Sequence, residues 1–224
     1  MTDAASATPA SIADEPSRYA VVDSKEQFVS GHVIDVRTDI VRMPSGDTTA
    51  RDVVVHPGAV GVIALDPEDR VLFIQQYRHA VGHLCWEPPA GLLDEAGEDP
   101  LDAARRELFE EAHVVAERWA VLLDAFTSPG LTDEAVRIYL ARDVRPAEGE
   151  RHQGEHEEVD MPTRWVALDD AVAALLAGRL HNPMAAMGVL ATAAARRRSY
   201  ADLRPADAPW PQMSQWPGSR AAHG

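Results

Sequence analysis

The sequence predicts a mixed α/β sandwich that is preceded by an antiparallel β extension. The first observation is that residues 18–56 alternate apolar and polar side chains, which is the pattern of half-buried strands. The second is that residues 58–200 mix short apolar runs with three helical segments, which is typical of layered α/β domains. A chain of 224 residues with 46% hydrophobic content suits one domain of about 150–200 residues plus extensions.

The composition limits the classes of partner. The formal net charge of −15 argues against binding to nucleic acid or to an anionic membrane, because both require basic patches. An anionic substrate would therefore have to be held by local cations, either a metal or arginine. Cys85 is the only cysteine, so no internal disulfide can form, and we interpret it as a small core residue. Because the N-terminus has no signal-peptide pattern and no apolar run approaches about 18 residues, we expect a soluble, cytoplasmic protein.

The N-terminal part divides into two segments. Residues 1–17 are small and polar and contain proline, which predicts disorder. Residues 18–57 contain about three antiparallel strands, with a turn at residues 44–47 between the second and the third. Three strands are too few for an independent core, so this extension must pack on the main domain or on a second subunit.

The main domain is predicted to span residues 58–200. Residues 60–65 and 71–77 are apolar strands on either side of an Asp-Pro-Glu-Asp turn, and we interpret them as a β-hairpin. Further elements follow, with strands at residues 120–125, 135–141 and 165–168 and amphipathic helices at residues 169–177 and 183–198.

A tail follows the domain over residues 201–224. It contains four prolines and two tryptophans, Trp210 and Trp216. The sequence leaves two alternatives open: either these tryptophans dock on the body or on a partner, or the tail is loose.

One acidic helix is the strongest candidate for a functional site. Asp99 and Pro100 fit the N-cap and the first helical position, and good helix formers follow. On a helical wheel, Glu107, Glu110 and Glu111 fall within an arc of roughly 100°, away from the apolar face. Crowded carboxylates repel each other unless a cation binds them, and Mg²⁺ or Mn²⁺ prefers oxygen ligands. The alternative is a solvated acidic face, which is the usual meaning of a run of charges.

The segment around this helix resembles the signature of a known enzyme family. From Gly91, the residues follow the pattern G-x6-E-x7-R-E-L-x-E-E. This is similar to the Nudix box of hydrolases that act on nucleoside diphosphate derivatives, G-x5-E-x7-R-E-U-x-E-E-x-G-U with U aliphatic. The chain departs from it twice, because one extra residue lies between Gly91 and Glu98 and His113 replaces the closing glycine. The insertion falls in a loop, and histidine can adopt the left-handed conformation of a helix end.

The resemblance implies a Nudix-type α/β/α sandwich, a dependence on Mg²⁺ or Mn²⁺ and a set of site residues. The metal ligands that it implies are the backbone oxygen of Ala90 and the side chains of Glu107, Glu110 and Glu111. The supporting residues that it implies are Gly91, Glu98 and Arg106. Of these, Glu98 and Arg106 would form a pair that orients the metal-binding glutamates.

Three further features are similar to the ADP-ribose pyrophosphatase branch of this family. Pro129 lies 16 residues after His113, and residues 86–91 read W-E-P-P-A-G, close to the W-E-x-P-A-G of that branch. Residues 156–160 resemble its mobile acidic loop, which supplies a general base, here Glu158 with Glu157 as the next candidate. A base on a mobile loop reaches the attacking water only when the loop closes on bound substrate.

The same similarity implies substrate contacts and a homodimer. Arg51 and Arg78 would hold the phosphates or the terminal ribose, and Glu87 would accept hydrogen bonds from adenine or ribose hydroxyls. Pro129 would also contact the substrate. In this branch the N-terminal strands are exchanged across a two-fold dimer, so Arg51 would act on the substrate of the partner.

The function that the resemblance implies is Mg²⁺-dependent hydrolysis of ADP-ribose to AMP and ribose 5-phosphate. One alternative is hydrolysis of another nucleoside diphosphate derivative, such as NADH, a nucleotide sugar or a diadenosine polyphosphate. Another is a catalytically silent ADP-ribose-binding regulator. The complete set of metal carboxylates and the absence of an appended DNA-binding helix pair in the sequence argue against the regulator.

Overall fold

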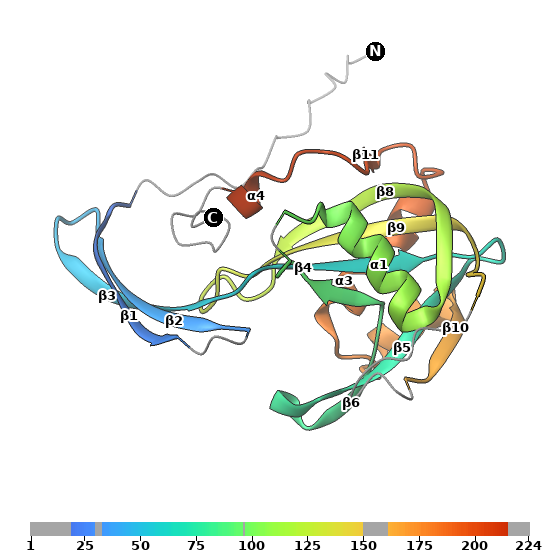
Figure 1. Cartoon of the computed structure of the whole chain (residues 1–224), viewed down its shortest axis with the longest axis horizontal. Coiled ribbons are helices and arrows are strands. Elements are labelled where there is room, and N and C mark those ends of the chain that lie inside the picture. The colour runs from blue at the N-terminus through green and yellow to red at the C-terminus, as the bar shows by residue number, and fades with distance from the viewer. Residues whose placement is uncertain (1–18, 30–32, 96, 150–160, 215–224) are drawn as a thin grey trace, which may run out of the picture.

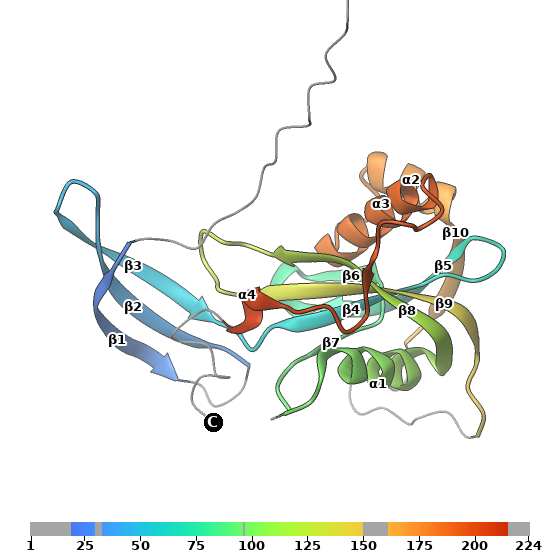
Figure 2. The ribbon, with the colours of Figure 1, turned by 90° about the horizontal axis from the view of Figure 1, so that it is seen from above.

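The computed structural model describes residues 19–29, 33–95, 97–149 and 161–214. Figure 2 shows three layers, with α1 (Pro100–Ala112) on one side of the strands and α2 (Leu168–Leu176) and α3 (Pro183–Arg196) on the other. A separate N-terminal sheet stands beside this body (Figure 1). The predicted α/β sandwich with a β extension is confirmed. The predicted disordered segment, residues 1–17, lies outside the described residues.

The N-terminal sheet consists of three antiparallel strands in the order β1-β2-β3. They span Val21–Val29, Asp35–Arg42 and Thr48–Val55. Gly46 has a φ of 92° and lies in the predicted turn between β2 and β3, where a positive φ favours glycine. Every residue of β1 is exposed, including the large apolar side chains of Val21, Val22, Phe28 and Val29.

Two sheets form the body. The larger has the order β11-β8-β9-β4-β7, in which the fully buried β4 (Ala59–Ala64) runs parallel to β9 (Ala135–Pro146). Its other strands are β7 (Ala90–Leu92), β8 (Val114–Phe126) and β11 (Arg204–Pro205). The smaller sheet has the order β10-β5-β6, with strands at Thr163–Ala167, Arg70–Arg78 and His83–Glu87 and a short 3₁₀ helix, η1, at His79–Val81.

The predicted hairpin of residues 60–65 and 71–77 forms only next to its turn, where Leu65 and Val71 make an isolated antiparallel bridge; the pairing predicted for the rest is wrong, because the two strands belong to different sheets. The turn itself forms, since the Asp66 side chain accepts a hydrogen bond from the N–H of Arg70 at 2.7 Å. Beyond it, β4 pairs with β7 and β9, whereas β5 pairs with β6 and β10. Both strands are continuous apolar runs buried between layers, so no alternation of side chains fixes their pairing partner.

Two buried clusters hold the layers together. One lies under α1, where Leu108 packs in a cluster with Val60 of β4 and Tyr139 of β9. The other lies between the strands and the helices α2 and α3. There a Cβ atom on Gly188 of α3 would lie 2.6 Å from the Ile63 side chain, so α3 packs directly on β4. The two clusters therefore place α1 and α3 on opposite faces of the same strand.

The C-terminal tail docks on the body through Trp210, which is 9% exposed and is followed by the short helix α4 (Pro211–Ser214). The Arg137 guanidinium of β9 lies 4.8 Å from the centre of the Trp210 ring. It also donates hydrogen bonds to the backbone oxygens of Ala208 and Pro209 at 2.7 and 3.1 Å. The docked alternative therefore holds for Trp210, whereas Trp216 lies outside the described residues.

Candidate active site

Helix α1 has fixed ends, which hold its acidic residues in place. The Asp99 side chain accepts a hydrogen bond from the N–H of Leu101 at 2.8 Å, and Pro100 occupies the first helical position, as predicted. At the other end His113 adopts the left-handed conformation with a φ of 54°, and its N–H donates to the Phe109 oxygen at 2.8 Å. Histidine therefore ends the helix in the way that a glycine would.

Arg106 connects the acidic residues around α1. Its Nε and Nη2 atoms donate to the two carboxylate oxygens of Glu98 at 3.0 and 2.9 Å, the geometry of a two-point charge-assisted pair. Its Nη1 atom donates to Glu107 at 2.6 Å and to Glu110 at 3.2 Å. The hydrogen bond to Glu98 raises the pKa of Arg106, and Arg106 in turn lowers the pKa of Glu98 below its usual 4.5. One guanidinium thus contacts three carboxylates.

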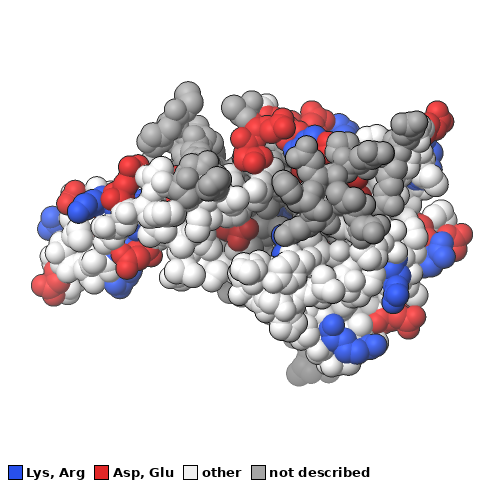
Figure 3. Space-filling view, turned by 60° about the horizontal axis from the view of Figure 1, so that its bottom comes forward, with Lys and Arg blue, Asp and Glu red and all other residues white. Residues whose placement is uncertain are grey.

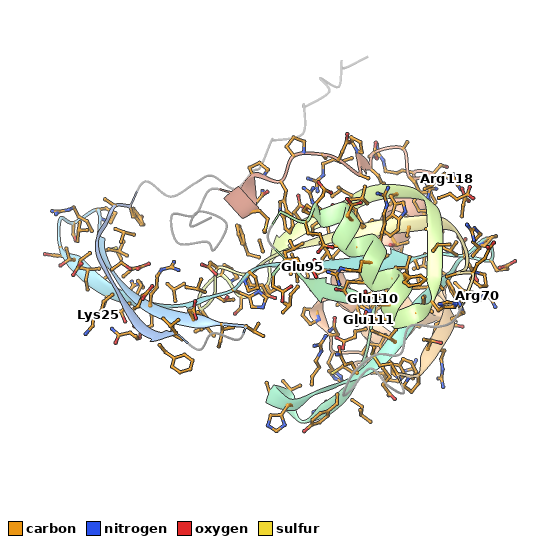
Figure 4. All side chains as sticks on the ribbon, in the orientation of Figure 1. Lys25, Arg70, Glu95, Glu110, Glu111 and Arg118 are labelled. Atoms are coloured by element: carbon orange, nitrogen blue, oxygen red, sulfur yellow. The ribbon has the colours of Figure 1, made fainter. Side chains whose placement is uncertain are left out.

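Glu107 and Glu111 lie against strand β7. The Glu111 carboxylate accepts a hydrogen bond from the N–H of Ala90 at 2.9 Å, and the residue is 6% exposed. Glu107 lies so close to Gly91 that a Cβ atom on this glycine would be 1.9 Å from the Glu107 Oε1 atom. Figure 4 shows Glu110 and Glu111 together on α1. Because Gly91 has no side chain, the carboxylates of α1 reach the backbone of β7.

These residues fit a hard divalent cation in kind and in position, since the Glu111 carboxylate lies beside the backbone of Ala90 and that of Glu107, one turn earlier, lies beside Gly91. Within the described residues, no three acidic, histidine or cysteine side chains converge on one point. The reason is that Arg106 pairs with Glu107 and Glu110, while Glu111 faces the N–H of Ala90. Arg106 contacts Glu98 through Nε and Nη2 and the two glutamates through Nη1, so its pair with Glu98 does not depend on them.

A second buried carboxylate, Glu87, lies at the end of β6 and is 1% exposed. The Arg78 Nε atom donates to its two oxygens at 2.9 and 3.2 Å, so two of the predicted substrate contacts bind each other. The Asn182 amide also donates to it, while the Asn182 oxygen caps α3 through the N–H of Ala185. Burial raises the pKa of Glu87, and Arg78 opposes this shift. From the sequence alone, Asn182 before Pro183 indicates only a helix cap, and its spare amide donor is the one signal of a second contact.

The remaining predicted site residues lie elsewhere. Arg51 lies on β3 of the N-terminal sheet, where its guanidinium donates to Thr49 and to the backbone oxygen of Ala50. Pro129 is exposed in the turn between β8 and β9. The predicted general bases, Glu157 and Glu158, lie outside the described residues. The structure thus brings together the predicted metal ligands and supporting residues on α1, β7 and the loop between them. It places Arg51 on the N-terminal sheet, which contains none of these residues.

The charged surface is mixed. On the face shown in Figure 3, the described lysine and arginine side chains form no continuous patch and are scattered among uncharged and acidic residues. This agrees with the formal net charge of −15, so an anionic substrate would have to be bound by individual arginines or by a metal ion and not by a basic surface. Within the described parts of the chain, no helix is both long enough and apolar enough to cross a bilayer.

Comparisons with known proteins agree with the resemblance of the α1 segment. A profile of the NUDIX domain matches residues 55–187. The chain is 43% identical over 187 residues to the ADP-ribose pyrophosphatase of Mycobacterium tuberculosis, which covers 84% of this chain and 89% of that protein. It is 37% identical over 164 residues to the methanol dehydrogenase activator of Bacillus methanolicus, covering 73% of this chain and 87% of that protein. A third relative is the ADP-ribose pyrophosphatase of Bacillus subtilis, 38% identical over 149 residues, with 66% and 79% covered.

A solved structure supports the fold. The crystal structure of an ADP compounds hydrolase matches with a TM-score of 0.65 and 19% identity, covering 83% of this chain and 98% of that one. The matched domain profile spans more than half of the chain and includes all of α1 and β7. The profile, the fold and the acidic helix lead to one conclusion: this chain belongs to the Nudix hydrolase family.

Proposed function

We propose that this protein hydrolyses the diphosphate bond of ADP-ribose to give AMP and ribose 5-phosphate. The observation that carries the proposal is that Glu107 and Glu111 lie against the backbone of residues 90–91, with Glu110 on the same helix and joined to Glu107 through Arg106. The choice of ADP-ribose is supported by the 43% identity to the Mycobacterium tuberculosis protein that bears this name.

The metal ligands that we propose are the backbone oxygen of Ala90 and the side chains of Glu107, Glu110 and Glu111. A bound Mg²⁺ or Mn²⁺ would neutralise the diphosphate oxygens and lower the pKa of the attacking water. Glu107 reaches β7 because Gly91 has no side chain. Glu111 is 6% exposed, and its shielding from water strengthens its attraction for a cation.

Glu98 and Arg106 are positioning residues in this proposal. Arg106 balances the negative charge of Glu107 and Glu110 while no cation is bound. Its two-point pair with Glu98 holds the guanidinium beside the helix when those glutamates turn to a metal. The positive charge of Arg106 thus reduces the repulsion between the glutamates of α1, and Glu98 keeps the Arg106 side chain beside them.

The general base that we propose is Glu158, with Glu157 as the next candidate. Both lie outside the described residues, so this assignment depends on the similarity of residues 156–160 to the acidic loop of the ADP-ribose pyrophosphatase branch. Glu158→Gln should lower turnover by at least about 10²-fold while leaving Mn²⁺ binding unchanged, because a general base contributes that much to such rates. Unchanged turnover would remove Glu158 from the mechanism.

For substrate binding we propose Arg78 and Pro129 of one subunit and Arg51 of the partner subunit. The Arg78 side chain is 45% exposed, and the buried Glu87 fixes its orientation. Because Glu87 already accepts hydrogen bonds from Arg78 and Asn182, we assign it to holding Arg78 in place. Arg51 lies on a sheet separate from α1, which fits a contribution to the other site of a dimer.

The homodimer is part of the same proposal. Every residue of β1 is exposed, and its side chains include the apolar Val21, Val22, Phe28 and Val29. A sheet that leaves several large apolar side chains exposed gains stability when a second copy covers them. Sedimentation of the purified protein should give twice the mass of 24.4 kDa. A monomer at micromolar concentration would contradict the exchange of the N-terminal strands.

Another nucleoside diphosphate derivative is the second candidate substrate. It is favoured by the 37% identity to the methanol dehydrogenase activator of Bacillus methanolicus, a relative whose name does not mention ADP-ribose. NADH, a nucleotide sugar and a diadenosine polyphosphate are the compounds to compare. A catalytically silent ADP-ribose-binding regulator is disfavoured, because the proposed metal carboxylates of α1 are all present.

A substrate panel with Mg²⁺ tests the proposal. The values of kcat/KM are measured for ADP-ribose, NADH, a nucleotide sugar and a diadenosine polyphosphate. ADP-ribose should give the highest value, with AMP and ribose 5-phosphate in equal amounts. Glu107→Gln should lower kcat by at least about 10²-fold, whereas the exposed Glu117→Gln on β8 should not. Efficient cleavage of another compound with ADP-ribose untouched would make the substrate assignment wrong, and binding of ADP-ribose without cleavage would support the regulator.

A further inference from the structure

The loop between β8 and β9, residues 127–134, is tied to the N-terminal sheet at Asp133. One carboxylate oxygen of Asp133 accepts a hydrogen bond from the backbone N–H of His56 at 2.9 Å, in the segment that joins β3 to β4. The other accepts a hydrogen bond from Nη1 of Arg37, on β2, at 3.3 Å. The side chains of Asp133 and Arg37 are only 14% and 10% exposed. Asp133 therefore holds two segments of the N-terminal part at once.

Backbone hydrogen bonds reinforce this attachment. The N–H of Val54, near the end of β3, donates to the oxygen of Leu131 at 2.9 Å, and the N–H of Asp133 donates to the oxygen of Val54 at 3.2 Å. Val54 and Thr132 thus form a parallel bridge. Both ribbon views show the β8–β9 loop beside the junction of the N-terminal sheet with the body (Figures 1 and 2). The loop cannot move relative to β3 without breaking these bonds.

The base of the loop is closed, and its tip faces solvent. The Thr127 hydroxyl contacts the Glu134 carboxylate, and the Thr127 N–H donates to the backbone oxygen of Glu134 at 3.3 Å. The tip carries Pro129, which is exposed, and Leu131, which is 58% exposed. A short loop that is closed at its base and attached to a sheet at one side presents its tip in a defined orientation.

Arg37 is itself fixed within the N-terminal sheet. Its Nε atom donates to Oδ2 of Asp39 at 3.1 Å, and Asp39 is 3% exposed. Asp39 also accepts a hydrogen bond from the hydroxyl of Ser24, on β1, at 2.5 Å. A connected series of polar contacts therefore runs from β1 through Asp39 and Arg37 to Asp133. Buried charges are tolerated only when paired, so the loss of one member disturbs the others.

We propose that Asp133 is a positioning residue that fixes the β8–β9 loop against the N-terminal sheet and thereby sets substrate affinity. The inference rests on the proposed function, in which Pro129 at the tip of this loop contacts the substrate. A contact on a loop contributes to affinity in full only when the loop is ordered before binding. Within the part of the chain that the structure describes, Asp133 makes hydrogen bonds with Arg37, His56 and Val54 and none with the acidic residues of α1. Asp133 should therefore influence binding and not the metal-dependent step.

The first test compares Asp133→Asn with a matched control, Asp143→Asn. The first change keeps an acceptor for His56 but removes the charge that faces Arg37. The second removes the same charge from an exposed ion pair with Arg118. Kinetics with ADP-ribose and Mg²⁺ should show KM raised about tenfold in Asp133→Asn, with kcat and the Mg²⁺ dependence within about twofold of wild type. Asp143→Asn should leave both parameters unchanged, and Asp133→Glu should recover part of the affinity.

Two kinetic outcomes overturn the inference. One is a KM within about twofold of wild type in folded Asp133→Asn, and the other is a kcat that falls as far as kcat/KM. If Asp133→Asn does not fold, Arg37→Lys replaces it, because lysine keeps the positive charge but lacks the planar fork of donors. Arg37→Lys should raise KM in the same direction by a smaller factor, and an unchanged KM in that folded variant counts against the inference equally.

Amide hydrogen exchange separates this inference from the proposed function. The N–H groups of Val54 and Asp133 donate between loop and sheet, so they should exchange faster in Asp133→Asn, while the His113 N–H at the end of α1 should not. An equal acceleration everywhere would mean general destabilisation and would contradict a positioning role. If the wild type cleaves no diphosphate, the proposed function fails and with it the link to affinity. If it cleaves ADP-ribose and KM does not respond to Asp133→Asn, only the inference fails.

Discussion

The two oxygens of the Glu98 carboxylate each accept a hydrogen bond from Arg106, from Nε at 3.0 Å and from Nη2 at 2.9 Å. This pair joins the loop before α1 to the helix and leaves Nη1 of Arg106 for Glu107 and Glu110. The loop, the helix and the acidic cluster therefore behave as one unit. A substitution of Glu98 should therefore alter the positions of two proposed metal ligands, Glu107 and Glu110, because both contact the same Arg106 guanidinium.

Glu98→Gln should remove a pH-dependent contribution to stability. Arg106 holds the pKa of Glu98 below its usual 4.5, so at acid pH the unfolded chain binds this proton more readily than the folded protein. The stabilisation is present above about pH 4.5 and is lost as the pH falls toward the lowered pKa. Thermal unfolding over a series of acid to neutral buffers should show the advantage of wild type over Glu98→Gln shrinking with falling pH. A difference that is constant over the series would contradict this account.

Glu87→Gln should show the opposite trend. Burial raises the pKa of Glu87 more than Arg78 lowers it, so the folded protein binds this proton more readily than the unfolded chain. The native state is then disfavoured as the pH rises from the usual 4.5 through the raised pKa. In the same thermal series, the stability of wild type relative to Glu87→Gln should therefore fall as the pH rises. A relative stability that increases with pH would mean that the ion pair with Arg78 outweighs burial.

Gly91→Ala should impair catalysis far more than folding. Its Cβ atom would lie 1.9 Å from the Glu107 Oε1 atom, so Glu107 must leave its place beside β7. A misplaced catalytic group of this kind should lower kcat with Mg²⁺ by about 10²-fold. The control is Gly188→Ala, whose Cβ atom would lie 2.6 Å from the Ile63 side chain in the core. It should lower the melting temperature but leave kcat of the folded protein unchanged, and an equal loss of kcat in both variants would indicate general destabilisation.

His113→Gly should be more stable than His113→Ala. The φ of 54° at this position is strained for alanine but not for glycine, and the strain amounts to about 1–2 kcal/mol. Both variants lose the contact with the Phe109 ring, whose centroid lies 5.6 Å away, so this loss cancels in the comparison. Urea denaturation should give a difference of about 1 kcal/mol in favour of glycine, because the larger backbone entropy that glycine loses on folding offsets part of the relieved strain. Equal stabilities would show that the left-handed conformation is not kept when the ring is removed.

The features of the fold that could be predicted from the sequence are formed by residues that lie close together along the chain. Asp99 caps α1 through the N–H two residues later, and Asn182 caps α3 in the same way three residues later. Gly46 forms the turn between two adjacent strands. The separation of β4 and β5 into different sheets could not be predicted, because two continuous apolar runs pair equally well with each other and with distant strands.

In the candidate site, too, contacts between residues close in the sequence could be predicted, whereas contacts between distant residues could not. The Glu98–Arg106 contact spans eight positions and follows from the spacing of the motif. The contacts between Glu87 and Asn182 and between Arg37 and Asp133 span 95 and 96 positions, so they depend on how the sheets and helices pack. Charged residues in an alternating strand are normally solvent-facing, and nothing in the local sequence marks Arg37 as buried.

The most direct test of the central claim is anomalous diffraction from crystals grown with Mn²⁺ and a non-hydrolysable ADP-ribose analogue. The account predicts an anomalous peak at about 2.0–2.3 Å from carboxylate oxygens of α1 and from the backbone oxygen of Ala90. It also predicts that Arg106 has released Glu107 and Glu110 but still holds Glu98. A map with no peak beside α1, in which Arg106 remains paired with Glu107 and Glu110, would contradict the assignment of this helix to metal binding.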